Sequence, residues 1–144
     1  MKTINLLNYA HDGWYQASGG LAEVHSAVSG EVVATTGSQG LDFKAMLDHA
    51  RNVGGPALRR MTFHERAWML KDLANAIMAR KEELYELSFE TGATRTDGWI
   101  DIEGGAGTLF SFSSKGRREL PNQRLLVDGQ MEPLSKGGTF VGQH

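Results

Sequence analysis

The apolar and polar positions divide the chain into three parts. Residues 1–40 hold short apolar runs separated by turn residues, a pattern typical of β strands. Residues 41–120 repeat apolar positions at intervals of three and four, which favours amphipathic helices. Residues 121–144 return to short apolar runs. The pattern predicts a mixed α+β fold with an N-terminal β-hairpin region, about three main helices and a C-terminal hairpin.

The first part contains a strong hairpin signal. Residues 4–9 and 14–15 flank Asp12-Gly13, and both residues of such a pair readily adopt the positive φ that a tight turn needs. Two further extended segments, residues 22–28 and 31–35, flank a Ser-Gly pair. We therefore expect residues 1–40 to be mainly β structure and turns.

Two helices are predicted from start and stop signals. Phe43, Leu47 and Ala50 share one helix face, and this first helix is expected to stop at residues 54–56, where the sequence is Gly-Gly-Pro. The second helix begins at Thr62, which can form a capping box with Glu65. We expect the helix to continue in residues 82–89 and to stop at Gly92. Its predicted buried face consists of Phe63, Ala67, Leu70, Ala74 and Ile77.

The third helix combines a helical period with glycines in its interior. Its predicted buried face consists of Trp99, Ile102, Ala106, Leu109 and Ser113, and Pro121 ends it. Gly104, Gly105 and Gly107 each cost about 1 kcal/mol relative to alanine, so tertiary packing must hold the helix. We expect these glycines to allow close approach of a neighbouring backbone. They match neither G-x-G-x-x-G nor a P-loop, which argues against phosphate binding.

A second hairpin is predicted near the end of the chain. Residues 125–127 and 131–134 flank Asp128-Gly129, and Pro133 suits an edge strand better than a central one. Lys136 lies among glycines but lacks P-loop spacing, so residues 135–138 are expected to form a solvated turn.

Composition narrows the function classes. The 144 residues suit one domain, and a formal net charge of -2 gives no basic excess for nucleic acid. Arg117, Arg118 and Arg124 form the only local basic cluster. The absence of cysteine excludes a disulfide, a thiolate metal site and a cysteine nucleophile within these residues. No apolar run approaches the roughly 20 residues needed to span a bilayer, and the expected location is cytoplasmic.

Candidate catalytic residues have simpler structural interpretations. His64-Glu65 lacks the second histidine of a metalloprotease helix, because position 68 is Trp68. Asp97, Asp101 and Glu103 could form an acid/base pair, but Asp97 also suits the first turn of the third helix, where the helix dipole stabilises it. We predict no catalytic, cofactor-binding or metal-binding residue in this chain.

Several motifs together resemble a known family. They lie in residues 91–95, 99–105, 107–110 and 118–121, with further agreement in residues 29–31, 40–42, 56–59, 61–63, 65–67, 69–71 and 133–136. These sequence segments closely resemble those of one group of aldehyde dehydrogenases. The strongest resemblance is to the ring-opening proteins of bacterial phenylacetate degradation, in which an oxepin-CoA hydrolase is joined to a semialdehyde dehydrogenase. The dehydrogenases of benzoyl-CoA breakdown show the second strongest resemblance.

The resemblance implies an α/β parent fold and an oxidation of an acyl-CoA semialdehyde with NAD or NADP. In that family a cysteine attacks the aldehyde, an asparagine and a backbone amide hold the oxyanion, and a glutamate activates water. None of these residues matches a position in this chain. The resemblance therefore implies that residues 1–144 are a single incomplete domain, the N-terminal part of an oligomeric oxidoreductase, inactive and without cofactor on its own. It also implies that the elements that pack on the glycines of the third helix lie in part beyond residue 144. Its expected partners are the remainder of the dehydrogenase or further subunits, with neither nucleic acid nor membrane. The alternative is a non-catalytic interaction module that associates with a full-length dehydrogenase.

Overall fold

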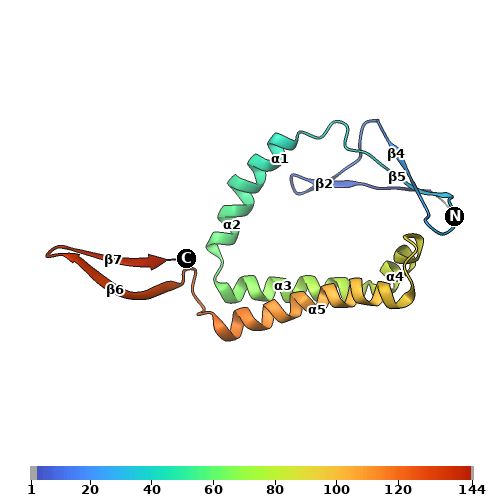
Figure 1. Cartoon of the computed structure of the whole chain (residues 1–144). Coiled ribbons are helices and arrows are strands. Elements are labelled where there is room, and N and C mark those ends of the chain that lie inside the picture. The colour runs from blue at the N-terminus through green and yellow to red at the C-terminus, as the bar shows by residue number, and fades with distance from the viewer. Residues whose placement is uncertain (1–2, 144) are drawn as a thin grey trace.

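The computed structural model describes residues 3–143, which form an open ring of strands and helices with a projecting hairpin (Figure 1). Residues 1, 2 and 144, at the ends of the two predicted β regions, lie outside the described residues. The strands are β1 (Ile4–Asn5), β2 (Asn8–Ala10), β3 (Gly13–Tyr15), β4 (Ala22–His25), β5 (Val32–Thr36), β6 (Val127–Ser135) and β7 (Gly138–Gln143). The helices are α1 (Phe43–His49), the π-helical turn η1 (Ala50–Gly54), α2 (Gly55–Arg60), α3 (Phe63–Ala79), α4 (Lys81–Glu90) and α5 (Arg95–Glu119).

The N-terminal part is β structure, as the sequence predicts. Strands β2 and β3 form the expected hairpin, but its turn residues are His11 and Asp12, with φ of 51° and 60°, and not Asp12 and Gly13. The register pairs Ala10 with Gly13, so Gly13 belongs to β3. Strand β1 does not extend this hairpin; it pairs in parallel with β5, which also pairs antiparallel with β4.

The first predicted helix continues through its expected stop, so that prediction is wrong. A π-helical turn links α1 to α2, and the amide of Gly55 donates to the carbonyl of Ala50 five residues earlier. Pro56 then falls in the first turn of α2, a position that proline favours because its φ is already helical. The result is a continuous helical arm from Phe43 to Arg60.

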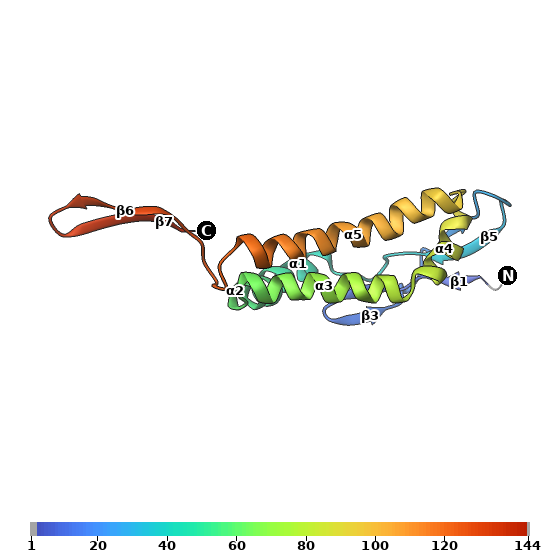
Figure 2. The ribbon, with the colours of Figure 1, turned by 90° about the horizontal axis from the view of Figure 1, so that it is seen from below.

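Helices α3 and α5 lie side by side and antiparallel in both ribbon views (Figures 1 and 2). The predicted capping box between Thr62 and Glu65 is confirmed at the start of α3. On the predicted faces, Ala67 and Ala74 of α3 are buried, with 4% and 0% of their surface exposed. Ala106 and Ser113 of α5 are buried in the same way, at 1% and 0%.

One expectation about α5 is wrong, and a second, the close approach of a backbone to its glycines, stays a prediction. The helix is unbroken, but a Cβ built at Gly104, Gly105 or Gly107 would meet nothing within 4 Å, so no described residue approaches them closely. The close approaches occur at other glycines of the same helix. A Cβ at Gly98 would lie 3.1 Å from the hydroxyl of Ser88, and one at Gly116 would lie 3.1 Å from the Cβ of Ala67. Trp99, expected on the buried face, is 56% exposed.

The C-terminal hairpin is present, but its turn lies later than predicted. Strands β6 and β7 are joined around Lys136 and Gly137, and the residues of this turn are exposed, as expected for a solvated turn. Asp128-Gly129 instead lies within β6 at a shift in register, where Gly129 has a φ of +80°. Longer pairing between β6 and β7 displaces the turn, and the hairpin projects away from the helices (Figure 2).

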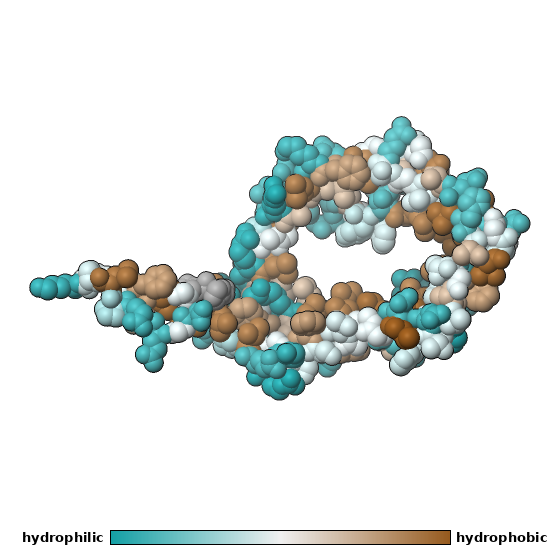
Figure 3. All heavy atoms as spheres, viewed as in Figure 1, coloured by the Kyte–Doolittle hydropathy of each residue, from teal (hydrophilic) through white to brown (hydrophobic). Residues whose placement is uncertain are grey.

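Apart from Tyr85, the buried apolar side chains are those of alanine. Among residues 3–143 they are Ala17, Ala34, Ala67, Ala74, Tyr85 and Ala106. Large apolar side chains lie instead at the surface, and apolar residues gather on several sides of the opening through the ring (Figure 3). No helix in the described part of the chain is both long enough and apolar enough to cross a membrane. The fold thus exposes much of the apolar surface that a packed domain covers.

Replacing Gly104, Gly105 or Gly107 singly by alanine should stabilise the chain. The added Cβ meets no neighbour, so each substitution gains helix propensity of roughly 0.5–1 kcal/mol without a clash. Thermal unfolding followed by circular dichroism measures the effect. Gly116→Ala is the matched control in the same helix, since its Cβ would crowd Ala67 and offset the gain. A lower melting temperature for all three variants than for Gly116→Ala would contradict the open environment of these glycines.

Candidate functional site

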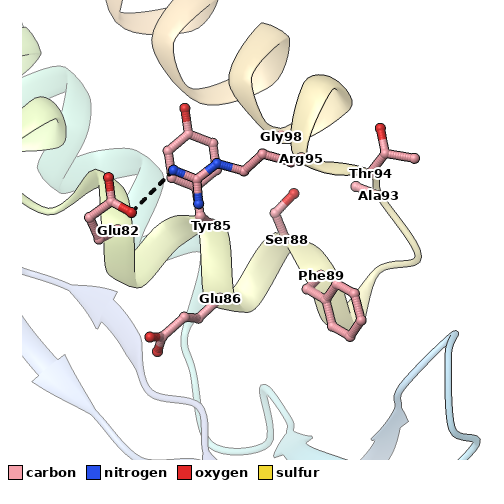
Figure 4. A pocket seen from close by; sticks show the side chains of 9 residues that line it. All are labelled: Glu82, Tyr85, Glu86, Ser88, Phe89, Ala93, Thr94, Arg95 and Gly98. Carbon is pink, nitrogen blue, oxygen red and sulfur yellow. Dashed lines mark hydrogen bonds and ion pairs between the residues drawn. The ribbon is translucent and has the colours of Figure 1, made fainter.

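A polar pocket of about 260 Å³ lies between α4 and the beginning of α5 (Figure 4). The short connection after Gly92, whose φ of +83° ends α4 as predicted, brings the two helices together here. Its lining residues are Glu82, Tyr85, Glu86, Ser88, Phe89, Ala93, Thr94, Arg95 and Gly98.

Arg95 is the central cation of this pocket. Its guanidinium carbon lies 3.8 Å from the centre of the Tyr85 ring, a stacked cation–π arrangement. A guanidinium nitrogen of Arg95 is also 3.3 Å from a carboxylate oxygen of Glu82, and Figure 4 shows both side chains converging on the same side of α4. Both charged groups are largely exposed, so the pair contributes little to stability but partly neutralises the positive charge.

The hydroxyl group of Tyr85 belongs to a second network, which also contains Lys81 and Glu103. This hydroxyl donates to a carboxylate oxygen of Glu103 at 2.7 Å, and the ammonium of Lys81 is 3.1 Å from the same oxygen. The Tyr85 hydrogen bond, together with that from Lys81, lowers the pKa of Glu103. Burial and the bond to Glu103 raise the pKa of the Tyr85 phenol. Glu103 therefore stays ionised and fastens α5 to two residues of α4.

Asp97 has a capping role and does not pair with Glu103. Its carboxylate accepts hydrogen bonds from the Thr94 hydroxyl at 2.6 Å and from the Thr94 amide at 3.0 Å. These bonds lower the pKa of Asp97. Asp101 is exposed on the next turn. The lowered pKa values of Asp97 and Glu103 are the opposite of what a general acid near neutral pH requires. The absence of catalytic residues from this chain stays a prediction.

The other sequence candidates also have structural roles. Nε2 of His64 is 2.9 Å from the carbonyl oxygen of Leu120 and ties the start of α3 to the end of α5. The basic cluster is dispersed, because Arg117 stacks on Trp68 while Arg118 pairs with Glu119. Within residues 3–143, no group of three or more His, Asp and Glu side chains could hold a metal ion.

Sequence reasoning missed the Lys81–Tyr85–Glu103 network. Lys81 and Tyr85 are four residues apart and share one face of α4, a spacing that could have identified them as a pair. Their common partner on α5 depends on how the two helices pack, which the spacing alone does not give. The pocket thus lies at a junction where Tyr85 links α4 to Glu103 of α5 and Arg95 pairs with Glu82.

Comparison with known proteins places the chain in a family. The model of the aldehyde dehydrogenase family matches residues 14–135. The chain belongs to the aldehyde dehydrogenase family. It is 33% identical over 142 residues to a 3,4-dehydroadipyl-CoA semialdehyde dehydrogenase of Aromatoleum evansii, an alignment that covers 98% of this chain. The chain spans 27% of the length of that relative.

These comparisons confirm the resemblance to aldehyde dehydrogenases that the sequence motifs indicated. The relative is a dehydrogenase of a CoA-linked semialdehyde, which supports that group within the family. The ranking of the phenylacetate ring-opening group above its relatives receives no specific support and stays a prediction.

Replacing Tyr85 by phenylalanine should raise the pKa of Glu103 towards its ordinary value, because the hydroxyl that most strongly favours the carboxylate is removed. A carboxyl whose pKa is lowered by folding stabilises the chain above its unfolded pKa, and this contribution is lost as the pH falls through the folded pKa. The wild-type chain should therefore lose more stability than Tyr85→Phe on acidification below about pH 4.

Carbon NMR titration of the Glu103 carboxyl measures this change directly. Thr91→Val is the control, because its hydroxyl donates to the Ser88 carbonyl outside the network and should leave the Glu103 titration unchanged. An identical Glu103 pKa in Tyr85→Phe and the wild type would show that the phenol does not hold this carboxylate.

Proposed function

We propose that this chain forms a scaffold part of an NAD(P)-dependent aldehyde dehydrogenase that oxidises an acyl-CoA semialdehyde. The main support for this proposal is the alignment of 98% of the chain with a semialdehyde dehydrogenase. The family model also matches most of the residues. The activity for which that relative is named supports the CoA-linked substrate class. Phenylacetate degradation as the pathway and a cytoplasmic location remain finer predictions from the sequence.

The reaction centre is proposed to lie outside these residues. Oxidation of an aldehyde by this family requires a thiolate that adds to the carbonyl and a nicotinamide that accepts hydride. The sequence contains no cysteine and cannot supply that thiolate. Gly104, Gly105 and Gly107 form no cradle for a dinucleotide either, since they lie inside α5 and not in a turn between a strand and a helix. No catalytic step is therefore assigned to this chain.

Surface chemistry supports a scaffold role. Large apolar side chains such as Trp99, Phe112 and Leu73 are 50% or more exposed on α5 and α3, while the caps and polar clamps of these helices are complete. A pre-shaped helix pair with uncovered apolar faces suits packing against another polypeptide. The proposed partners are the remainder of a dehydrogenase or further subunits of one.

A non-catalytic module is the second candidate. The capping boxes of α3 and α5 and the Lys81–Tyr85–Glu103 clamp are formed within the chain itself, which favours a unit that folds before it associates with a full-length dehydrogenase. Co-expression with the Aromatoleum evansii enzyme tests this candidate. Failure to co-purify, together with a circular dichroism spectrum of an unfolded chain, would rule it out.

A chimaeric enzyme provides the decisive test of the scaffold proposal. Residues 1–144 should replace the aligned part of the Aromatoleum evansii dehydrogenase and keep oxidation of 3,4-dehydroadipyl-CoA semialdehyde, measured as reduced cofactor formed. The isolated chain, with NAD or NADP and the same aldehyde, should give no more reduced cofactor than a heat-denatured control. A folded but inactive chimaera would contradict the scaffold role, and turnover by the isolated chain would contradict the placement of the reaction centre elsewhere.

A further inference from the structure

Three arginines from three different elements line one open pocket of about 420 Å³. Arg59 comes from the last turn of α2, Arg66 from the first turns of α3, and Arg124 from the segment that follows α5. Phe63 and Leu125 complete the lining. The pocket lies within the size range of small-molecule sites, which is roughly 300–1,000 Å³.

Backbone contacts fix the elements that carry these arginines. The amide of Phe63 donates to the carbonyl of Gln123 at 2.9 Å, and His64 bonds the carbonyl of Leu120 at the same distance. The segment carrying Arg124 is therefore held against the start of α3. Arg59 is brought close because α2 ends only three residues before α3 begins.

The positive charge of the pocket is not neutralised within the described chain. Arg80, Arg95 and Arg118 each pair with a glutamate, whereas no described carboxylate pairs with Arg59, Arg66 or Arg124. The nearby acids already have other partners. Glu65 accepts from the Thr62 amide at 2.7 Å, and Glu119 lies 3.2 Å from Arg118 and 3.7 Å from Lys115.

Arg66 gives an independent indication that an acceptor belongs here. Its Nε is buried and has no hydrogen-bond partner among the described residues. Its guanidinium lies over the Phe63 ring, 4.6 Å from the ring centre, which orients the group but satisfies none of its N–H donors. Because Arg66 lines the pocket, an anion bound there would lie beside a guanidinium that no described acceptor satisfies.

We propose that the Arg59–Arg66–Arg124 pocket binds phosphate groups of the CoA part of a thioester. Guanidinium groups match the oxygens of a phosphate through paired N–H donors. A CoA thioester carries a diphosphate bridge and a 3′-phosphate, several anionic groups for three cations. Phe63 and Leu125 provide apolar walls for the uncharged parts of the ligand. The identity of the ligand rests on the proposed function, whereas the anion site rests on the arginines alone.

Binding to the full 144-residue chain tests this proposal by calorimetry with four probes: CoA, 3′-dephospho-CoA, NADP and inorganic pyrophosphate. CoA should bind, and its affinity should fall as salt is added, because the contacts are ionic. Tighter binding of CoA than of 3′-dephospho-CoA would assign the 3′-phosphate to the arginines. Equal binding of the two would assign the diphosphate bridge. Both results support the proposal.

Matched variants locate the binding. Arg66→Gln should weaken CoA binding roughly 10- to 100-fold, as expected for loss of a charge-assisted hydrogen bond. Arg124→Gln, on the segment outside the helices, should weaken it similarly and serves if Arg66→Gln does not fold. Arg118→Gln is the control, since Arg118 pairs with Glu119 and does not line this pocket.

Three results would overturn the proposal: no binding of any phosphate probe to the folded chain, unchanged affinity in both folded variants, or tighter binding of NADP than of CoA. The first result would instead indicate that the three guanidinium groups pair with carboxylates of another polypeptide. These outcomes are separate from those of the chimaera, which can lose activity while this chain still binds CoA.

Discussion

The contact between α3 and α5 is the constraint on which the rest of the structure depends. Its buried residues are small: Ala67 and Ala74 on α3, and Ala106 and Ser113 on α5. A Cβ at Gly116 of α5 would lie 3.1 Å from the Cβ of Ala67. Small side chains let the two helix backbones approach closely. Every other element is attached to one end of this pair: the helical arm and the C-terminal hairpin at one end, and α4 with the N-terminal strands at the other (Figure 1). A bulky residue at this contact would separate the helices and displace both ends.

The same contact limits how much apolar surface the chain can bury. Alanine, serine and glycine remove little apolar area from water, and burial is the main source of folding free energy. The helix pair is therefore supported by polar devices at its ends, namely the two capping boxes, His64 on the Leu120 carbonyl and the Glu103 clamp. The large apolar side chains point away from the contact and stay exposed. Their burial requires another polypeptide surface, which agrees with a scaffold role in an aldehyde dehydrogenase.

Local signals predicted much of this fold, and the errors arose where pairing or packing outweighed them. The capping box at Thr62 gave the start of α3, because its partners are three residues apart in the sequence. The stop at residues 54–56 failed because a π-helical turn joins α1 to α2 and Pro56 falls in the first turn of α2, which proline tolerates. Both hairpins were foreseen, but their turns shifted because strand register, and not the Asp-Gly pair alone, decided where each chain reversal falls.

For the arginines, closeness in the sequence does not predict closeness in the structure. Arg117, Arg118 and Arg124 are close in sequence, yet each has a different surrounding in the structure. Arg59, Arg66 and Arg124 are spread over 66 positions and still meet at one pocket, because α2, α3 and the segment after α5 converge there. No spacing rule links them, so only the packing of α3 on α5 could reveal the cluster.

Gly104, Gly105 and Gly107 connect the fold to the proposed scaffold role. They lower the intrinsic stability of α5, yet no described residue uses the space that they leave. The helix persists because its first turn is capped by Thr94 and Asp97 and because Glu103, immediately before the glycines, is held by Tyr85 and Lys81. These clamps fix the helix on the N-terminal side of the glycines, and the contact of Ser113 and Gly116 with α3 fixes it on the other. The glycine face is thus held in helical form while remaining open, which is the arrangement that close packing of a further backbone requires.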